Sequence, residues 1–122
     1  ELYTAHLEGV AYVERLAYQV LEGLGAEIGP EIYVAGGTTA SAPWLQLRAD
    51  ILGRTLRVPS ISEAAFGAAI VAAGTTIYDG LVPATGAMVH VDEEVAPRLA
   101  YCSAYDERYT RFFRACQERG YV

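Results

Sequence analysis

The chain has 122 residues and a formal net charge of −6, from 15 acidic residues and 9 basic residues, all of them Arg. A P-loop uses a Lys on nucleotide phosphates and a Schiff-base enzyme uses a Lys amine, so the absence of Lys excludes both. The acidic balance argues against nucleic acid and anionic membranes as partners, because both are bound through basic patches. The length suits one compact domain, and the apolar content of 52% favours a well-filled core or a face that meets a partner.

Cysteine and histidine are too few and too scattered to predict a zinc site. Cys102 and Cys116 form no CxxC pair, and the only imidazoles are His6 and His90. We expect two reduced thiols in a cytoplasmic protein, because no signal-peptide pattern opens the chain and no apolar run is long enough to span a membrane. The first residue is Glu1 and not Met, which favours part of a longer chain.

The first half of the chain predicts helix, strand and helix. Apolar residues recur at three- and four-residue spacing over 2–24, which is typical of an amphipathic helix. Residues 32–35 form a short β-branched run that predicts a buried strand ending at the pair Gly36-Gly37. A second helix is expected from Ser41, as a possible cap, to the stop at Gly53.

A second strand and a third helix follow. Residues 55–58 alternate in polarity, which predicts a half-buried strand. Ser60 and Glu63 have the spacing of a capping box. They precede a helix of small residues that we expect over 64–77.

Residues 79–100 contain scattered Gly and Pro, and we expect irregular structure with a possible edge strand at 87–91. Aromatic residues at helical spacing predict a last amphipathic helix over about 101–119. Alternating helices and strands imply an α/β layer fold with a parallel sheet. Only two strands are clearly predicted, and two parallel strands rarely form a stable sheet alone. The sequence therefore resembles part of a domain with a larger sheet.

The stretch after the first predicted strand is the candidate for chemistry. A glycine pair, Gly36-Gly37, is followed by the hydroxyl residues Thr38 and Ser41 and by a helix start. Glycines let the backbone approach a ligand, and a helix N-terminus offers free N–H groups to an anion, so this is a candidate nucleotide cradle. The alternative is a tight turn in which Ser41 only caps the helix.

The context of this stretch resembles the FGGY family of carbohydrate kinases, which includes xylulose, gluconate and glycerol kinases. The family motif Glu-Gly-(Ile/Val)-Ala-aromatic followed by Arg matches 8–12 and Arg15. Its Gly-Gly, small residue and Ser or Asn match 36–38 and Ser41, although many members carry a third Gly where this chain has Thr38.

Further matches follow in order along the chain. The family pattern Trp-x-Gln and Ala-Asp-(Ile/Val)-Leu-Gly matches 44–46 and 49–53. Its Pro, acidic residue and Leu-Gly-Ala-Ala match Pro59, Glu63 and 66–69, with Phe in place of the usual Leu. Its C-terminal spacing of aromatic residues matches Tyr105, Tyr109 and Phe112.

The resemblance implies the second half of a ribonuclease H-like, actin-like ATPase domain. Residues 1–122 would be the C-terminal portion of the nucleotide-binding domain of an enzyme that phosphorylates a sugar or polyol with ATP and Mg²⁺. It implies nucleotide binding by Gly36, Gly37, Thr38 and Ser41, with the helix that carries Gly67 nearby. No residue here matches the general base or a metal ligand, which we expect upstream, so the isolated segment should be inactive.

Other polar residues receive structural interpretations. Asp50 lies in the packing motif of the family, and Glu8 and Arg15 lie on one helix face, where an interdomain or surface role is favoured over catalysis. The competing hypothesis is a non-catalytic α/β interaction module in which the glycines only form a turn. In either case we expect an exposed apolar patch near 32–36 and 55–58, covered by another copy in a homo-oligomer or by residues outside this chain.

Overall fold

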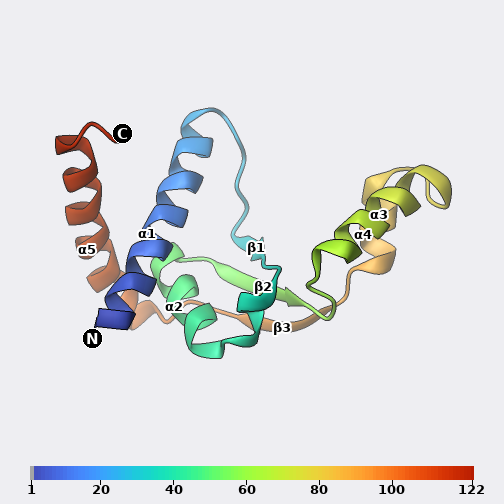
Figure 1. Ribbon diagram of the computed structural model, residues 1–122, viewed down its shortest axis with the longest axis horizontal. Helices are drawn as coiled ribbons and strands as arrows, with labels where there is room; N and C mark the ends of the chain where they lie inside the picture. Colours follow the sequence, from blue (N-terminus) through green and yellow to red (C-terminus); the bar gives the residue numbers. More distant parts are fainter. Residues whose placement is uncertain (1) are drawn as a thin grey trace.

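The computed structural model describes residues 2–122 and has the expected α/β character. The chain begins with a long helix, and strands and helices then alternate up to a second long helix at the C-terminal end (Figure 1). The elements are α1 (Leu2–Gly23), β1 (Glu31–Tyr33), the 3₁₀ helix η1 (Gly37–Ala40), α2 (Ala42–Leu52), β2 (Thr55–Pro59), α3 (Ala64–Thr76), α4 (Leu81–Met88), β3 (Val91–Val95) and α5 (Leu99–Glu118).

The three strands form one mixed sheet in the order β1-β2-β3. As predicted, β1 and β2 are parallel, with Ile32 opposite Leu56. β3 is antiparallel to β2, with Val95 opposite Leu56 on the other side. Leu56 is therefore at the centre of the sheet and is fully buried. β1 is an edge strand, so one side of its backbone is unpaired within residues 2–122.

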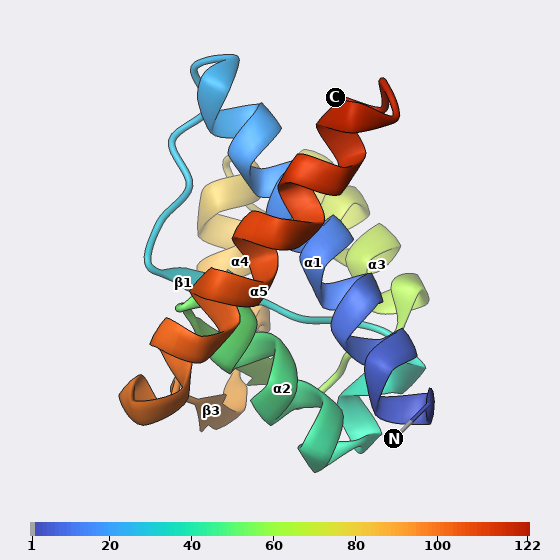
Figure 2. The ribbon, with the colours of Figure 1, turned by 90° about the vertical axis from the view of Figure 1, so that its left-hand side faces the viewer.

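Helix α2 is the central element of the core because two of its faces are buried. One face packs on the sheet, where Leu45 and Ala49 meet residues of all three strands. Another face carries Leu47 and Ile51, which pack against α1 and α5. Figure 2 shows α1 and α5 crossing each other, with α2 below the crossing. The resulting order of layers is sheet, α2, and then the pair α1 and α5.

Helices α3 and α4 form a hairpin at the opposite end of the molecule from α5 (Figure 1). They pack mainly on each other, and Gly74 lies against Gly80 and Leu81 at their junction. Apart from Asp79 in the turn, no residue from 64 to 88 is charged. The hairpin therefore gains its stability from close contact between small residues.

The region 79–100 is more regular than the sequence predicts. Residues 81–88 form α4, where we expected irregular structure, and the strand expected at 87–91 lies at 91–95 instead. Pro83 is tolerated because it lies in the first turn of α4, where its missing N–H is not needed. Asp92-Glu93-Glu94 obscures the strand pattern in the sequence.

The predicted capping box before α3 is wrong. The residue that precedes the helix is Glu63, three residues after Ser60, and its side chain makes no capping bond. The Ser60 hydroxyl instead donates a hydrogen bond of 3.3 Å to the carbonyl oxygen of His90, next to β3. Ser60 therefore joins two loops.

Candidate functional site

The glycine pair after β1 has two different conformations. Gly36 has φ 90° and ψ 177°, a region that L-residues with a side chain scarcely occupy. Gly37 has no positive φ and begins η1. The backbone conformation therefore requires glycine at position 36, and it does not require glycine at position 37.

Packing around Gly37 does not require a glycine either. A Cβ atom built there would meet no other heavy atom within 4 Å. No acceptor within residues 2–122 bonds the N–H group of Gly37 or that of Thr38. The loop thus presents two free backbone donors beside an open space, and a small anionic group could approach them.

Two hydrogen-bonding contacts tie this loop to the segment between β2 and α3, and a third bond lies within the loop. The Gly36 N–H group donates to the carbonyl oxygen of Ser62 at 2.8 Å. The Thr39 hydroxyl donates to the carbonyl oxygen of Gly36 at 2.9 Å, and its oxygen lies 3.2 Å from the Ser62 hydroxyl. No local pattern predicts the contact of Thr39 with Ser62, because 23 residues separate them and no motif links them.

The structure places Thr38 and Ser41 on the same exposed loop as the two glycines. Ser41 occupies the position before α2, as predicted, but its hydroxyl makes no capping bond. The Ser41 carbonyl oxygen accepts the N–H group of Leu45 at 3.0 Å and so begins the helix. The Ser41 side chain therefore remains available to bind a ligand.

An apolar cavity of about 540 Å³ opens beside Gly36, on the face of the sheet opposite α2. Ala35 and Ser62 line it next to the glycine loop, and Phe66, Gly67 and Ile70 line it from α3. Tyr33, with an exposed fraction of 58%, lines it from β1. The expected apolar patch is therefore present on this face at Tyr33 and Ala35, but no residue of 55–58 lines it. Ile32, Val34 and Leu56 are buried beneath α2 on the other face.

Ser41 lines a different cavity, of about 350 Å³, between the N-terminal ends of α1 and α2. Tyr3, Trp44 and Arg98 contribute to the same cavity. None of Gly36, Gly37 and Thr38 lines either cavity. The glycine loop thus separates two hollows, and the four candidate residues share one loop without sharing one pocket.

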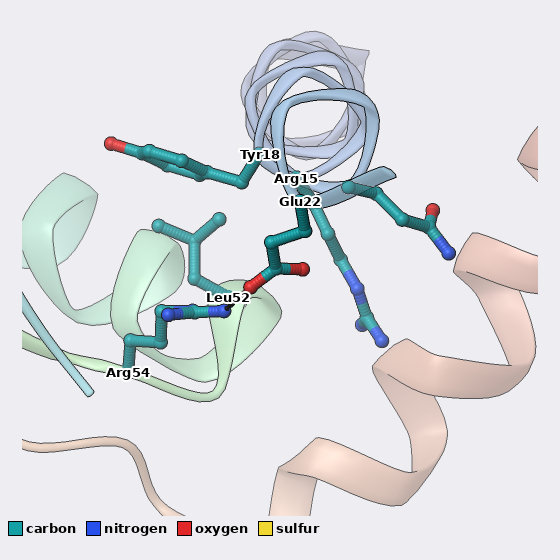
Figure 3. A pocket seen from close by; sticks show the side chains of 6 residues that line it. Arg15, Tyr18, Glu22, Leu52 and Arg54 are labelled. Carbon is teal, nitrogen blue, oxygen red and sulfur yellow. Dashed lines mark hydrogen bonds and ion pairs between the residues drawn. The ribbon is translucent and has the colours of Figure 1, made fainter. Parts of the chain in front are cut away.

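A third, polar pocket of about 190 Å³ lies between α1 and the C-terminal end of α2 (Figure 3). Arg54 donates to Glu22 at 2.6 Å and to the carbonyl oxygens of Ile28 and Gly29. Arg15 donates to the carbonyl oxygen of Ile51 at 3.0 Å. Both guanidinium groups are thus engaged in holding the chain together.

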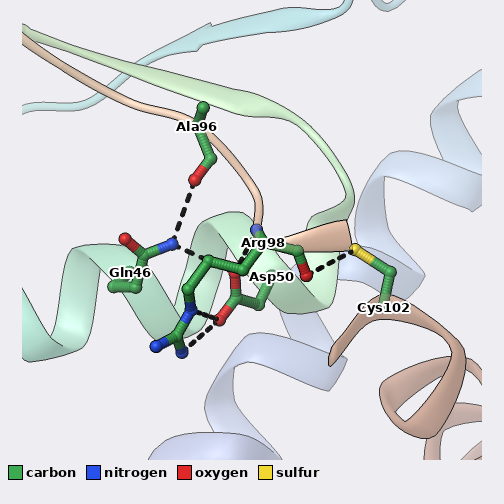
Figure 4. Close-up of polar contacts among 5 residues, drawn as sticks. All are labelled: Gln46, Asp50, Ala96, Arg98 and Cys102. Carbon is green, nitrogen blue, oxygen red and sulfur yellow. Dashed lines mark hydrogen bonds and ion pairs between the residues drawn. The ribbon is translucent and has the colours of Figure 1, made fainter. Parts of the chain in front are cut away.

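Asp50 has the structural role that the sequence predicts. Its side chain is fully buried, and its two oxygens accept hydrogen bonds from Gln46 and from the backbone and side chain of Arg98 (Figure 4). These bonds with the carboxylate raise the pKa of the Arg98 guanidinium. Arg15 pairs with Asp106 at 2.7 Å, and Glu8 with Arg108 at 3.0 Å, so both join α1 to α5.

No group of three or more metal-ligating side chains lies together anywhere in residues 2–122. Over the same residues, no helix is both long enough and apolar enough to cross a bilayer.

The comparison with protein families decides what this arrangement belongs to. The model of the FGGY family of carbohydrate kinases, C-terminal domain, matches residues 1–75. The chain belongs to this family. The match includes the glycine loop, α2, β2 and nearly all of α3.

Several kinases are similar to this chain in sequence and in fold. A probable L-xylulose kinase of Pasteurella multocida is 38% identical over 80 residues, which are 65% of this chain and 16% of that protein. An autoinducer-2 kinase of Photorhabdus laumondii is 28% identical over 108 residues, 87% of this chain and 20% of that protein. The crystal structure of xylulose kinase from Rhodospirillum rubrum matches with a TM-score of 0.76 and 29% identity, over 96% of this chain and 24% of that one.

The chain thus spans between about a sixth and a quarter of the length of these FGGY relatives. The likeness to xylulose kinase covers nearly the whole chain, so the α/β fold is that of the corresponding part of an FGGY kinase. The mixed sheet and five helices fit a part of an actin-like domain.

Proposed function

We propose that this chain is the C-terminal portion of the nucleotide-binding domain of a carbohydrate kinase. The whole enzyme transfers the γ-phosphoryl group of ATP to a hydroxyl of a sugar or polyol. Its C-terminal portion contributes to the ATP and ADP site through Gly36, Gly37, Thr38 and Ser41. In such enzymes catalysis comes mainly from positioning the phosphates and stabilising their charge.

The observation that carries this proposal is the open space at Gly37. Neither its φ nor its neighbours require a glycine, so the position is open to an approaching ligand that a side chain would obstruct. The free N–H groups of Gly37 and Thr38 suit phosphate oxygens, since backbone donors bind anions at such turns. The exposed hydroxyls of Thr38 and Ser41 add hydrogen-bonding groups on the same loop.

The apolar cavity beside the loop is the candidate binding site for the adenine base. Its volume of about 540 Å³ lies in the range of small-molecule sites, which are mostly apolar with a few polar groups. Ala35 and Ser62 continue from the glycine loop, and Gly67 adds a flat helix surface because it has no side chain. A base bound here would contact Ala35 and Ser62, next to the loop that carries the phosphate donors.

The remaining parts of the enzyme are assigned to residues outside this chain. We place the general base and the sugar site upstream, and we assign Mg²⁺ to the phosphates and to upstream ligands. We further propose a cytoplasmic enzyme that forms a homo-oligomer.

Nucleotide binding by the chain itself tests its share of the site. We expect millimolar Mg-ADP or Mg-ATP to raise the melting temperature of the chain, because a ligand that binds the folded state stabilises it. Gly37→Val should abolish the shift, since the side chain fills the approach to the free donors. Gly29→Val is the matched control, because Gly29 is another loop glycine with open space and ordinary φ. An equal loss of the shift in both variants would contradict the assignment of Gly37.

Activity is tested separately, with a coupled assay of ADP release and a panel of pentuloses, gluconate and glycerol. We expect no turnover from this chain alone, because no residue in it serves as the base. Turnover would overturn the placement of the base upstream.

The second candidate function is a non-catalytic interaction module, and the exposed apolar cavity favours it. In this case Tyr33 and Ile61, exposed by 58% and 46%, belong to a surface that another strand or another copy covers. The unpaired edge of β1 would then be extended by that partner. A thermal scan with no shift at millimolar nucleotide, together with a dimer in solution, supports this function over nucleotide binding.

A further inference from the structure

The hydrogen bonds around Gly36 divide the backbone groups of the loop into two sets. Gly36 uses its N–H group on Ser62 and its carbonyl oxygen on Thr39. Gly37 and Thr38 keep their N–H groups free. The bonds on one side therefore determine the direction in which the two free donors point on the other.

Thr39 and Ser62 are well placed to hold this arrangement. Both side chains are half-buried, and their hydroxyl oxygens lie 3.2 Å apart. Thr39 acts from η1, whereas Ser62 acts from the segment that leads into α3. The two contacts thus hold Gly36 between η1 and the segment that leads into α3, in addition to the backbone bond from Gly36 to Ser62.

We propose that Thr39 and Ser62 are positioning residues, which lock Gly36 so that the Gly37 and Thr38 N–H groups form a fixed pair of donors for the phosphates of a nucleotide. This inference rests on the proposed nucleotide site. Adjacent glycines have a wide choice of backbone conformations, and ordering them on binding lowers affinity. A loop that is already ordered avoids that loss, which is the general effect of preorganisation.

The proposal makes a selective prediction. The locked donors face phosphates, so loss of the lock should weaken ADP and leave adenosine, which has no phosphate, unaffected. A general loss of structure would weaken both ligands alike. The ratio of the two dissociation constants therefore separates positioning from a purely structural role.

The experiment measures ADP and adenosine binding to the chain and its variants by equilibrium titration. Thr39→Val removes the hydroxyl at nearly constant shape, together with its contacts to the Gly36 carbonyl oxygen and to Ser62, and should raise the Kd for ADP about fivefold. Ser62→Ala keeps the backbone bond to Gly36 and should raise the Kd about twofold. The double variant should raise the Kd for ADP by no more than the product of the two single effects, because both substitutions remove the same contact between hydroxyl groups.

Thr39→Ser restores the hydroxyl and should bind ADP within about twofold of the unmodified chain. Ser60→Ala is the control, since this hydroxyl in the same segment bonds His90 and not the glycine loop. A second measurement needs no ligand, because the backbone amides of Gly36 and Thr39 should exchange hydrogen about fivefold faster in Thr39→Val.

Unchanged ADP binding in Thr39→Val, or equal weakening of ADP and adenosine, overturns the inference while the proposed function stands. An unmodified chain that binds neither ligand contradicts the proposed function and the inference together. Faster amide exchange with selective loss of ADP supports both.

Discussion

Arg98 holds Asp50 from two directions. The Asp50 Oδ2 atom accepts hydrogen bonds from Arg98 Nε at 3.0 Å and Nη2 at 2.6 Å, and Oδ1 accepts the backbone N–H of Arg98 at 2.7 Å. Asp50 lies in α2, and Arg98 directly precedes α5. The carboxylate thus joins the central helix to the start of the last helix, where no side chain of α5 caps its own N-terminus.

Removal of this carboxylate should weaken the whole fold. We expect Asp50→Ala to lower the free energy of unfolding by about 2 kcal/mol, because the donors of Gln46 and Arg98 lose their buried acceptor. Urea unfolding followed by circular dichroism measures the change. Asp106→Ala is the control, since that carboxylate is 59% exposed and its pairing with Arg15 should contribute less than about 0.5 kcal/mol. Equal losses in the two variants would argue against the special role of Asp50.

The buried phenol of Tyr12 should make the folded chain less stable at alkaline pH. Burial, reinforced by the charge of Glu8, raises the pKa of its phenol from 10.0 to about 12. The unfolded chain then releases the proton more readily than the folded chain, so the contribution is present below about pH 10 and is lost as pH rises through about 12. Two pKa units correspond to roughly 2–3 kcal/mol. Urea unfolding between these pH values, with tyrosinate absorbance as a second signal, tests the expectation.

Tyr12→Phe is the matched variant for this measurement. The Tyr12 hydroxyl is buried and has no hydrogen-bond partner within residues 2–122, whereas the ring packs on Tyr109 and Phe112. We expect the variant to be at least as stable at neutral pH and to lose less stability at high pH. The same alkaline loss in Tyr12→Phe would assign the effect to other buried tyrosines.

The two loop glycines should respond differently to alanine. Gly36→Ala forces a side chain into a backbone region that only glycine occupies readily and should lower the free energy of unfolding by about 1–3 kcal/mol. Gly37→Ala should change it by less than about 0.5 kcal/mol, because its φ is ordinary and the space is open. Thermal unfolding of both variants without nucleotide measures the difference. A strong loss in Gly37→Ala would mean that folding, and not a ligand, requires glycine there.

A second glycine pair tests the packing of the α3–α4 hairpin. A Cβ atom at Gly74 would lie 2.9 Å from Leu81 Cδ2 and 3.2 Å from the carbonyl oxygen of Gly80, so Gly74→Ala should separate the helices and lower stability by about 1 kcal/mol. Gly67→Ala on the same helix meets open space and should gain about 0.5–1 kcal/mol from helix propensity. Hydrogen exchange of residues 64–88 reports both changes, and a gain in Gly74→Ala would contradict the close contact.

The sequence predicts α1, β1, α2, β2, α3 and α5 because each has a clear hydrophobic period or a strong stop signal. It does not predict α4, whose small residues pack only against another small-residue helix. It also misplaces β3, because three acidic residues interrupt the alternation. Arg57 on the neighbouring strand pairs with Glu94 at 2.9 Å and so balances one of these three acidic charges.

The residues of the candidate site also fall into those that the sequence predicts and those that it does not. The glycines, Thr38 and Ser41 are adjacent in sequence, so a local motif reveals them. Thr39 and Ser62 meet only through the pairing of two loops, and Phe66 and Tyr33 share a cavity only through the sheet. Local patterns carry no information on such contacts until the topology is known.

The isolation of the α3–α4 hairpin has a kinetic consequence. Because these helices rest mainly on each other, they form a cooperative unit that can open without disturbing the core around α2. Ser62 connects this unit to the glycine loop. Opening of the hairpin would therefore disturb the glycine loop only through the segment that contains Ser62. The backbone amides that exchange hydrogen most slowly should lie in α2 and β2, which this opening leaves folded.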